Sequence, residues 1–137
     1  MDLSSYHLEI VTPDGLHFDG QAEKLTVRTV SGDVCILANH MNYVTALGMG
    51  EAKVFADGSE RVAACIGGIL SVDNNHVRLV PTTFEWSEDI DIERAAKSEA
   101  KARQALSTKN NLSRQSVAMA EARLKRSLLR QNVAKHK

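Results

Sequence analysis

The chain has 137 residues, and its 17 Lys and Arg balance its 17 Asp and Glu, which fits one ordinary domain or a small domain with an appendage. No apolar run approaches the roughly 18 residues that span a bilayer, so we expect a soluble or peripheral protein. Residues 1–5 lack the basic start and apolar run of a secretory signal, and they are not Arg-rich like a transit peptide.

The charge is divided unequally between two parts of the chain. Residues 1–99 carry 7 Lys and Arg against 16 Asp and Glu, whereas residues 100–137 carry 10 against 1. The composition changes near residues 85–95, after which Gly and Pro are absent and Ala, Lys, Arg, Gln, Leu and Ser dominate. We therefore predict two domains, residues 1–86 and residues 87–137.

The first part reads as a series of short strands. Apolar and polar residues alternate from Tyr6 to Val11, and we expect a bulge or corner at Gly20 and a last strand that ends before Pro81. Cys35 and Cys65 lie in apolar runs, which favours buried reduced thiols over a disulfide. Turn signals recur every eight to twelve residues and indicate eight to ten antiparallel strands in a sandwich or barrel: Pro13-Asp14-Gly15, Ser31-Gly32-Asp33, Asp57-Gly58 and Asp73-Asn74-Asn75.

From Asp91 onward the apolar period becomes helical. After a break at residues 107–111, Ser113 is placed to cap a second helix, and two helices joined by so short a loop form an antiparallel hairpin. The fold class predicted is α+β, an N-terminal antiparallel β-sandwich followed by a C-terminal two-helix antiparallel hairpin. The expected buried stripes are Ile92, Ala95, Ala96, Glu99, Ala102 and Leu106 on the first helix and Val117, Ala120, Leu124 and Leu128 on the second.

Patterns that carry enzyme chemistry are not found in the sequence. The five histidines are scattered, and the glycine pairs near residues 48–50 and 67–68 do not lie between a strand and a helix, as a phosphate loop requires. No nucleophile-elbow sequence occurs either. We therefore predict neither a metal site nor an active site.

The last helix is strongly basic, with only Glu121 to offset its cations. Three interpretations stay open: binding of nucleic acid, docking onto an acidic protein surface that includes the chain's own first part, and a solvated helix face. Nucleic-acid binding is disfavoured because the segment has no aromatic residue and the first part is acidic. Arginines with acids nearby also suit a nucleotide, because the guanidinium fork matches phosphate.

Five segments, in this order, carry a resemblance to a known family. They are residues 6–13 (YHLEIVTP), 32–40 (GDVCILANH), 44–47 (VTAL), 67–72 (GGILSV) and 90–95 (IDIERA). Together with the helical hairpin that follows, they make the chain resemble the epsilon subunits of bacterial F-type ATP synthases, the counterparts of mitochondrial delta. The resemblance covers essentially the whole chain.

The resemblance implies a non-catalytic rotor subunit of the central stalk, which couples ion translocation to ATP synthesis. Its implied partners are the gamma subunit and the c-ring, and the catalytic alpha and beta subunits when the hairpin extends and restrains ATP hydrolysis. No nucleic acid is implied as a partner, and the implied location is the cytoplasmic face of the membrane, reached only through the complex. The alternative is a stand-alone module whose basic helices bind nucleic acid or an acidic protein.

The resemblance also assigns site residues. No cofactor is required, but some members bind ATP as a regulatory ligand, and Lys101 stands where the best ATP binders have Arg. Asp91 also has a plain alternative role as a helix cap. The ATP-binding residues implied are Glu85, Ile90, Asp91, Arg94, Ala95, Arg126 and Arg130. The rotor contacts implied are Ser31, Gly32, Asp33 and His40, which we expect on turns at one end of the sandwich. The inhibitory contacts expected are Arg114, Arg123, Lys125, Arg126 and Arg130.

Overall fold

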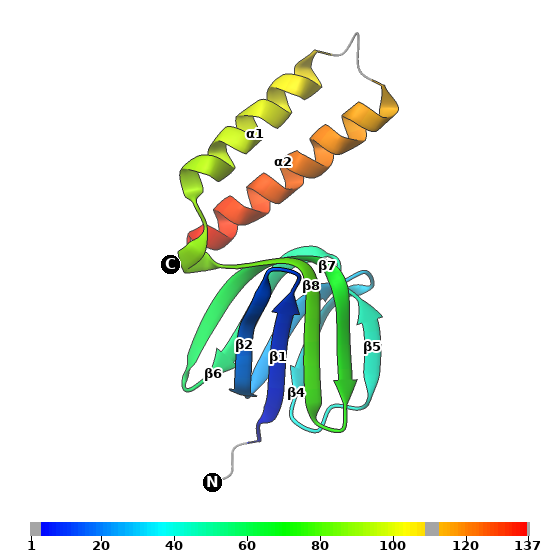
Figure 1. The fold of residues 1–137 in the computed structure, drawn as a ribbon, viewed down its shortest axis with the longest axis vertical. Helices are drawn as coiled ribbons and strands as arrows, with labels where there is room; N and C mark the ends of the chain where they lie inside the picture. Colours follow the sequence, from blue (N-terminus) through cyan, green and yellow to red (C-terminus); the bar gives the residue numbers. More distant parts are fainter. Residues whose placement is uncertain (1–3, 109–112, 137) are drawn as a thin grey trace. The chain divides into compact units, whose positions relative to one another are not determined.

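The computed structural model describes residues 4–108 and 113–136, and the chain divides into two compact units, Met1–Trp86 and Ser87–Lys137. The first, here the sandwich unit, holds eight strands, and the second, here the hairpin unit, holds the helices (Figure 1). The strands are β1 (Tyr6–Thr12), β2 (Gly15–Ala22), β3 (Lys24–Thr29), β4 (Gly32–Leu37), β5 (Tyr43–Ala46), β6 (Met49–Ala56), β7 (Ser59–Asp73) and β8 (His76–Trp86). The helices are η1 (Ser87–Asp89), α1 (Ile92–Ser107) and α2 (Arg114–Ala134). The α+β prediction is confirmed.

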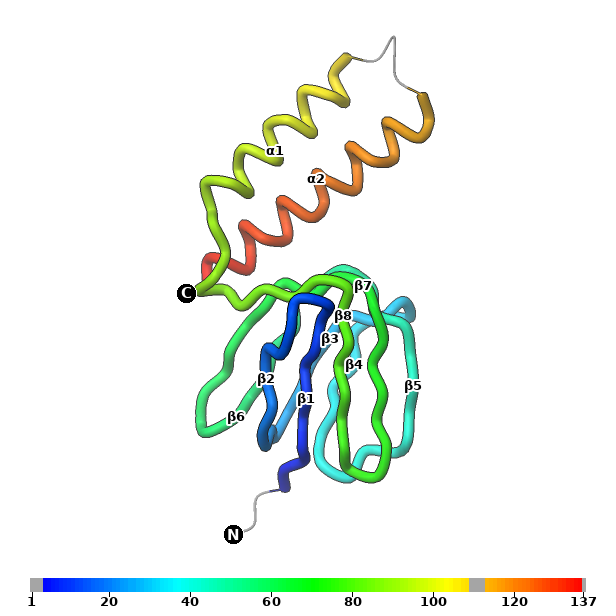
Figure 2. The backbone as a smooth tube through the Cα atoms, viewed as in Figure 1, coloured from blue at the N-terminus to red at the C-terminus, as the bar shows by residue number. Residues whose placement is uncertain are grey.

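One continuous path of strands forms both layers of the sandwich. The strands are ordered β2-β1-β8-β7-β6-β3-β4, and β5 pairs with β7. The first part of β7 pairs with β6, whereas its last residues pair with β5, so this long strand passes from one layer to the other (Figure 2). All the pairs are antiparallel except β1 with β8, which run parallel.

The bend in β7 depends on two glycines. Gly67 and Gly68 have positive φ values of 67° and 101°, which residues with a side chain rarely adopt. A Cβ on Gly68 would lie 2.0 Å from the carbonyl oxygen of Val80, so only glycine lets β7 approach β8 here. These two glycines therefore mark a bend inside one continuous strand.

Two of the predicted strand features are wrong. Gly20 lies in regular register with Leu8, and the bulge instead falls where the register shifts between Ile10 and Val11. β8 does not stop before Pro81, because Pro81 pairs with Gly68 at the bend and the strand continues to Trp86.

The core between the layers is apolar and closed by a few polar contacts. The Tyr6 hydroxyl donates to the carbonyl oxygen of Ile36 at 2.9 Å, and burial raises the pKa of Tyr6. Burial also raises the pKa of the Cys65 thiol to about 12. Cys35, by contrast, is exposed, because it faces outward with Thr26, so the prediction of two buried thiols is wrong for this one. The largest fully buried side chains are Tyr6, Leu8, Ile10, Leu25, Ile36, Leu70 and Leu79.

The helices α1 and α2 are capped as the sequence predicts. The Asp91 carboxylate accepts from the Arg94 amide at 3.1 Å, and the Ser113 hydroxyl accepts from the Ser116 amide at 3.1 Å. Such caps satisfy donors that have no partner inside the helix. Among the described residues no helix combines the length and apolar character needed to cross a membrane.

The seam between α1 and α2 is narrower than predicted. Near its end α2 buries Val133 and Ala134. Elsewhere Ala95 and Ala102 are buried on α1, and Ala120 and Ser127 on α2, each pair seven residues apart. These small side chains allow the helices to approach closely. The prediction that Ile92, Ala96 and Leu128 are buried is wrong, because Ile92 is 47% exposed, Ala96 is exposed and Leu128 is 37% exposed.

Candidate functional site

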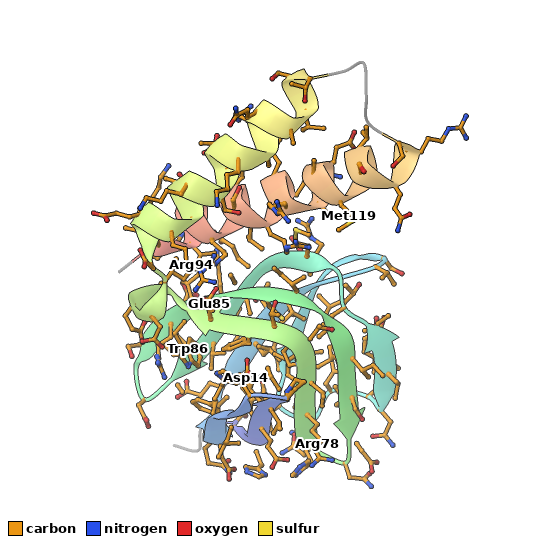
Figure 3. All side chains as sticks on the ribbon, turned by 45° about the horizontal axis from the view of Figure 1, so that its top comes forward. Asp14, Arg78, Glu85, Trp86, Arg94 and Met119 are labelled. Atoms are coloured by element: carbon orange, nitrogen blue, oxygen red, sulfur yellow. The ribbon has the colours of Figure 1, made fainter. Side chains whose placement is uncertain are left out.

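The hairpin unit contains a basic cleft between its two helices. Arg94, Lys97, Ser98 and Lys101 line it from α1, and Arg123 lines it from α2, around a cavity of about 380 Å³ (Arg94 is labelled in Figure 3). The three cations of α1 follow each other by three and four residues, so the helical period places them on one face. We call these five residues the basic cleft.

The electrostatics of the basic cleft favour an anion. No carboxylate among the described residues of the hairpin unit pairs with its four cations, whereas Arg103, outside the cleft, donates to Glu99 at 2.7 Å. Hydrogen bonds from Gln131 and Arg103 lower the pKa of Glu99, which keeps that acid engaged elsewhere. Guanidinium and ammonium groups converging on one hollow suit a ligand with several negative charges, such as a polyphosphate.

Only part of the implied ATP site is gathered in the basic cleft. Of the seven residues implied, only Arg94 lines it. Asp91 caps α1, Ile90 and Ala95 are buried, and Arg126 and Arg130 follow on α2 outside the cleft. Glu85 belongs to the sandwich unit. Lys97 and Ser98 also line the cleft but were not predicted from the sequence, although the helical spacing from Arg94 to Lys101 indicates both.

The expected inhibitory residues all lie on α2, but they do not share one face. Arg123, Arg126 and Arg130 follow at intervals of three and four, which places them along one stripe. Arg114 begins the helix, and Lys125 faces a different direction.

The expected rotor contacts lie at opposite ends of the sandwich unit. Ser31, Gly32 and Asp33 stand where β4 begins, whereas His40 follows Leu37, where β4 ends. A strand of that length is about 20 Å long, so the expectation that the four residues share one end is wrong. The Arg28 guanidinium donates to Asp33 and lowers its pKa.

The sandwich unit also exposes a row of apolar side chains across one layer. Ala46, Ile69 and Val80 stand opposite one another on β5, β7 and β8. Val11 and Leu16 pair on β1 and β2, and Val11 lies one position beyond the paired Ile10 and Leu79. Ile69 is 52% exposed, Val80 41% and Leu16 59%. We call these five residues the apolar row; contiguous exposed apolar surface of this kind is typical of protein interfaces.

Comparisons with known proteins agree with both units. The family described as ATP synthase, Delta/Epsilon chain, beta-sandwich domain matches residues 5–87. The ATP synthase epsilon chain of Ruminococcus albus is 38% identical over 98% of this chain and 100% of its own length. That of Shouchella clausii is 36% identical over 98% of each chain.

Solved structures share the fold. A chain of the Euglena gracilis mitochondrial ATP synthase (OSCP/F1/c-ring) superposes with a TM-score of 0.69 at 21% identity, covering 96% of this chain and 78% of that one. A chain of the Tetrahymena thermophila mitochondrial ATP synthase central stalk/c-ring gives 0.65 at 14% identity, covering 93% and 95%. From the family match and the full-length relatives, this chain belongs to the ATP synthase delta/epsilon family, as an epsilon chain.

Proposed function

We propose that this chain is a non-catalytic subunit of the central stalk of an F-type ATP synthase and couples ion translocation to ATP synthesis. It has no active site of its own, binds the gamma subunit and the c-ring, and reaches the cytoplasmic face of the membrane through the complex. The observation that carries this proposal is the apolar row, a ready contact surface on a sandwich whose full-length relatives are ATP synthase epsilon chains. Calorimetric titration of the Ile69→Glu chain against the gamma subunit tests it.

The hairpin unit restrains ATP hydrolysis in this proposal. The support is its basic α2, with Arg123, Arg126 and Arg130 along one stripe, which suits acidic surfaces on the catalytic alpha and beta subunits. The residues that α1 buries, Ala95 and Ala102, have small side chains, so separating the two helices exposes little apolar area from α1.

Deleting residues 87–137 is therefore expected to raise the ATPase rate of the assembled enzyme several-fold while leaving the sandwich unit attached. The truncated chain lacks the basic helix that would reach the catalytic subunits and obstruct rotation. The measurement is the steady-state ATPase rate of the reconstituted complex, with a chain lacking only residues 135–137 as the control. An unchanged rate in an enzyme that retains the truncated chain would remove the inhibitory role and leave the structural one.

ATP is the regulatory ligand in this proposal, and the basic cleft holds its phosphates. The support is the convergence of Arg94, Lys97, Lys101 and Arg123 around one hollow of about 380 Å³, which lies within the size range of small-molecule sites. The two cations beyond it on α2, Arg126 and Arg130, remain predicted contacts.

Arg94→Ala is expected to weaken ATP binding about tenfold, since one charge-assisted contact to phosphate is lost. Isothermal titration of the full chain with ATP measures this. Arg103→Ala is the matched control, because Arg103 lies on the same helix but pairs with Glu99 outside the cleft. Asp91 has two proposed roles, contact with ATP and capping of α1. Asp91→Asn separates them, because asparagine preserves the helix cap but not the charge. Equal affinities for the Arg94→Ala and unsubstituted chains would exclude the basic cleft as the ATP site.

A further inference from the structure

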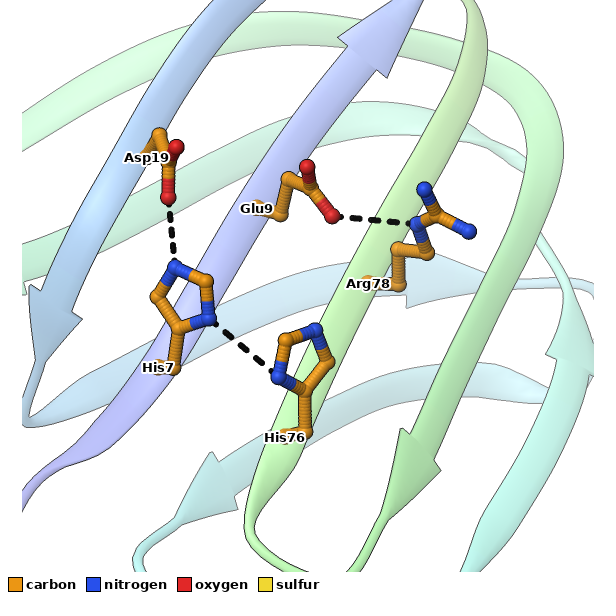
Figure 4. A network of polar contacts seen from close by, with 5 residues as sticks. All are labelled: His7, Glu9, Asp19, His76 and Arg78. Carbon is orange, nitrogen blue, oxygen red and sulfur yellow. Dashed lines mark hydrogen bonds and ion pairs between the residues drawn. The ribbon is translucent and has the colours of Figure 1, made fainter.

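Three side chains on the outer face of the sandwich unit form a linked polar cluster. His7 on β1 stands directly beside His76 on β8, because the parallel register pairs these two residues. Their Nδ1 atoms are 3.2 Å apart, and the other ring nitrogen of His7, Nε2, lies 2.5 Å from the Asp19 carboxylate on β2 (Figure 4). The sequence separates these residues by up to 69 positions, so no local spacing pattern reveals the cluster.

The Asp19 carboxylate determines which nitrogen of His7 is free. An ionised carboxylate only accepts hydrogen bonds, so Nε2 of His7 carries the proton and donates it. In the neutral ring Nδ1 then has a lone pair, and that lone pair lies on the side of His76. A carboxylate on the far nitrogen of a histidine is also the arrangement that orients metal-binding histidines and raises their basicity.

The spacing of the two Nδ1 atoms fits a shared metal ion. Zinc–nitrogen bonds of about 2.0–2.1 Å at a tetrahedral angle place two ligand nitrogens about 3.3–3.4 Å apart, close to the 3.2 Å observed. We propose that His7 and His76 bind a Zn²⁺ ion through their Nδ1 atoms, with Asp19 positioning the His7 ring. Without zinc, His76 donates its Nδ1 proton to His7, and on zinc binding it shifts to its other neutral tautomer.

The surroundings of the pair favour a cation and leave the site open. Asp73 stands opposite His76 in register, and the nearby Arg78 is engaged by Glu9 at 3.1 Å. Among the residues that the structure describes, no group of three or more His, Cys, Asp or Glu side chains gathers around one point. Water therefore completes the coordination, and the ion ties β1 to β8, the one parallel pair of the sheet.

The test is a calorimetric titration of the full chain with zinc chloride in a non-chelating buffer. One zinc ion per chain is expected. His7→Gln and His76→Gln should each weaken binding at least tenfold, and Asp19→Asn about tenfold, the lower end of the effect of removing an orienting partner. His136→Gln, which removes an imidazole in the hairpin unit, should leave the affinity unchanged. Equal zinc affinity in His76→Gln and the unsubstituted chain overturns the proposal.

A second measurement does not depend on any variant. Long-range ¹H–¹⁵N NMR spectra of the unsubstituted chain should show His7 protonated at Nε2 before zinc is added. On titration the Nδ1 resonances of both rings should shift together. A shift confined to Nε2, or to histidines other than these two, would contradict the site.

Discussion

Gly68→Ala is expected to lower the free energy of unfolding of the sandwich unit by about 3 kcal/mol or more, near the upper end for single substitutions. The new Cβ would lie 2.0 Å from the Val80 carbonyl oxygen and 2.6 Å from the Pro81 Cα, and both are backbone atoms that cannot rotate away. A φ of 101° adds conformational strain. Relief requires β7 and β8 to separate at the bend, where both layers join. Urea denaturation followed by circular dichroism measures the loss.

Substitutions of two other glycines separate the two causes of this loss of stability, the steric clash and the conformational strain. Gly58 also has a positive φ, 78°, but nothing lies within 4 Å of the position that a new Cβ would take, so Gly58→Ala reports conformational strain alone, about 1 kcal/mol. Gly20 has no positive φ and its nearest contact is 3.8 Å away, so Gly20→Ala should change stability by less than about 1 kcal/mol. If Gly68→Ala costs no more than Gly58→Ala, the close approach of β8 is not what restricts this position.

The strands were predictable wherever one face is buried, because alternation then marks the buried face directly. In the alternating run from Tyr6 to Val11, Leu8 and Ile10 are buried, and Asp57-Gly58 forms a turn with both residues at positive φ. The end of β8 was not predictable, because proline donates no hydrogen bond and normally ends a central strand. Pro81 is tolerated because its partner is Gly68, at the bend of β7.

The helices were placed correctly, but their contact surface was not. Apolar type suggested that Ile92 and Leu128 face the seam, yet both are exposed, and the buried residues of α1 are the small Ala95 and Ala102. The sequence did place Ala95, Ala102 and Ala120 in the seam, but it did not show that the larger residues beside them stay exposed, because that depends on the partner helix.

The candidate sites differ in how much the sequence reveals. Ser31 and His40 are separated by a single strand, β4, so strand counting alone already places them at opposite ends. The cations of α1 in the basic cleft follow from helical spacing. The apolar row and the His7–His76 pair do not, because both depend on the register between β1 and β8, which are distant in sequence and joined only in the folded sheet.

Ile69→Glu is expected to weaken binding of the full chain to the gamma subunit at least 100-fold, about 3 kcal/mol. Ile69 lies in the apolar row between Ala46 and Val80 and is 52% exposed. An interface that covers the row would bury the new carboxylate without a partner, and such burial is costly. Because the side chain points outward, the stability of the free chain should change by less than about 1 kcal/mol. Calorimetric titration against purified gamma subunit measures the affinity.

The matched control is Met119→Glu, the same change of an exposed apolar residue on α2 (labelled in Figure 3). Met119 is 59% exposed, so the control adds an equal charge to the surface of the other unit. If the sandwich unit carries the attachment, this variant binds gamma as the unsubstituted chain does. Equal weakening by both variants would indicate a general effect of charge on association. Undiminished binding by Ile69→Glu would mean that the stalk meets another surface of the sandwich unit, and the apolar row would then have no part in the attachment.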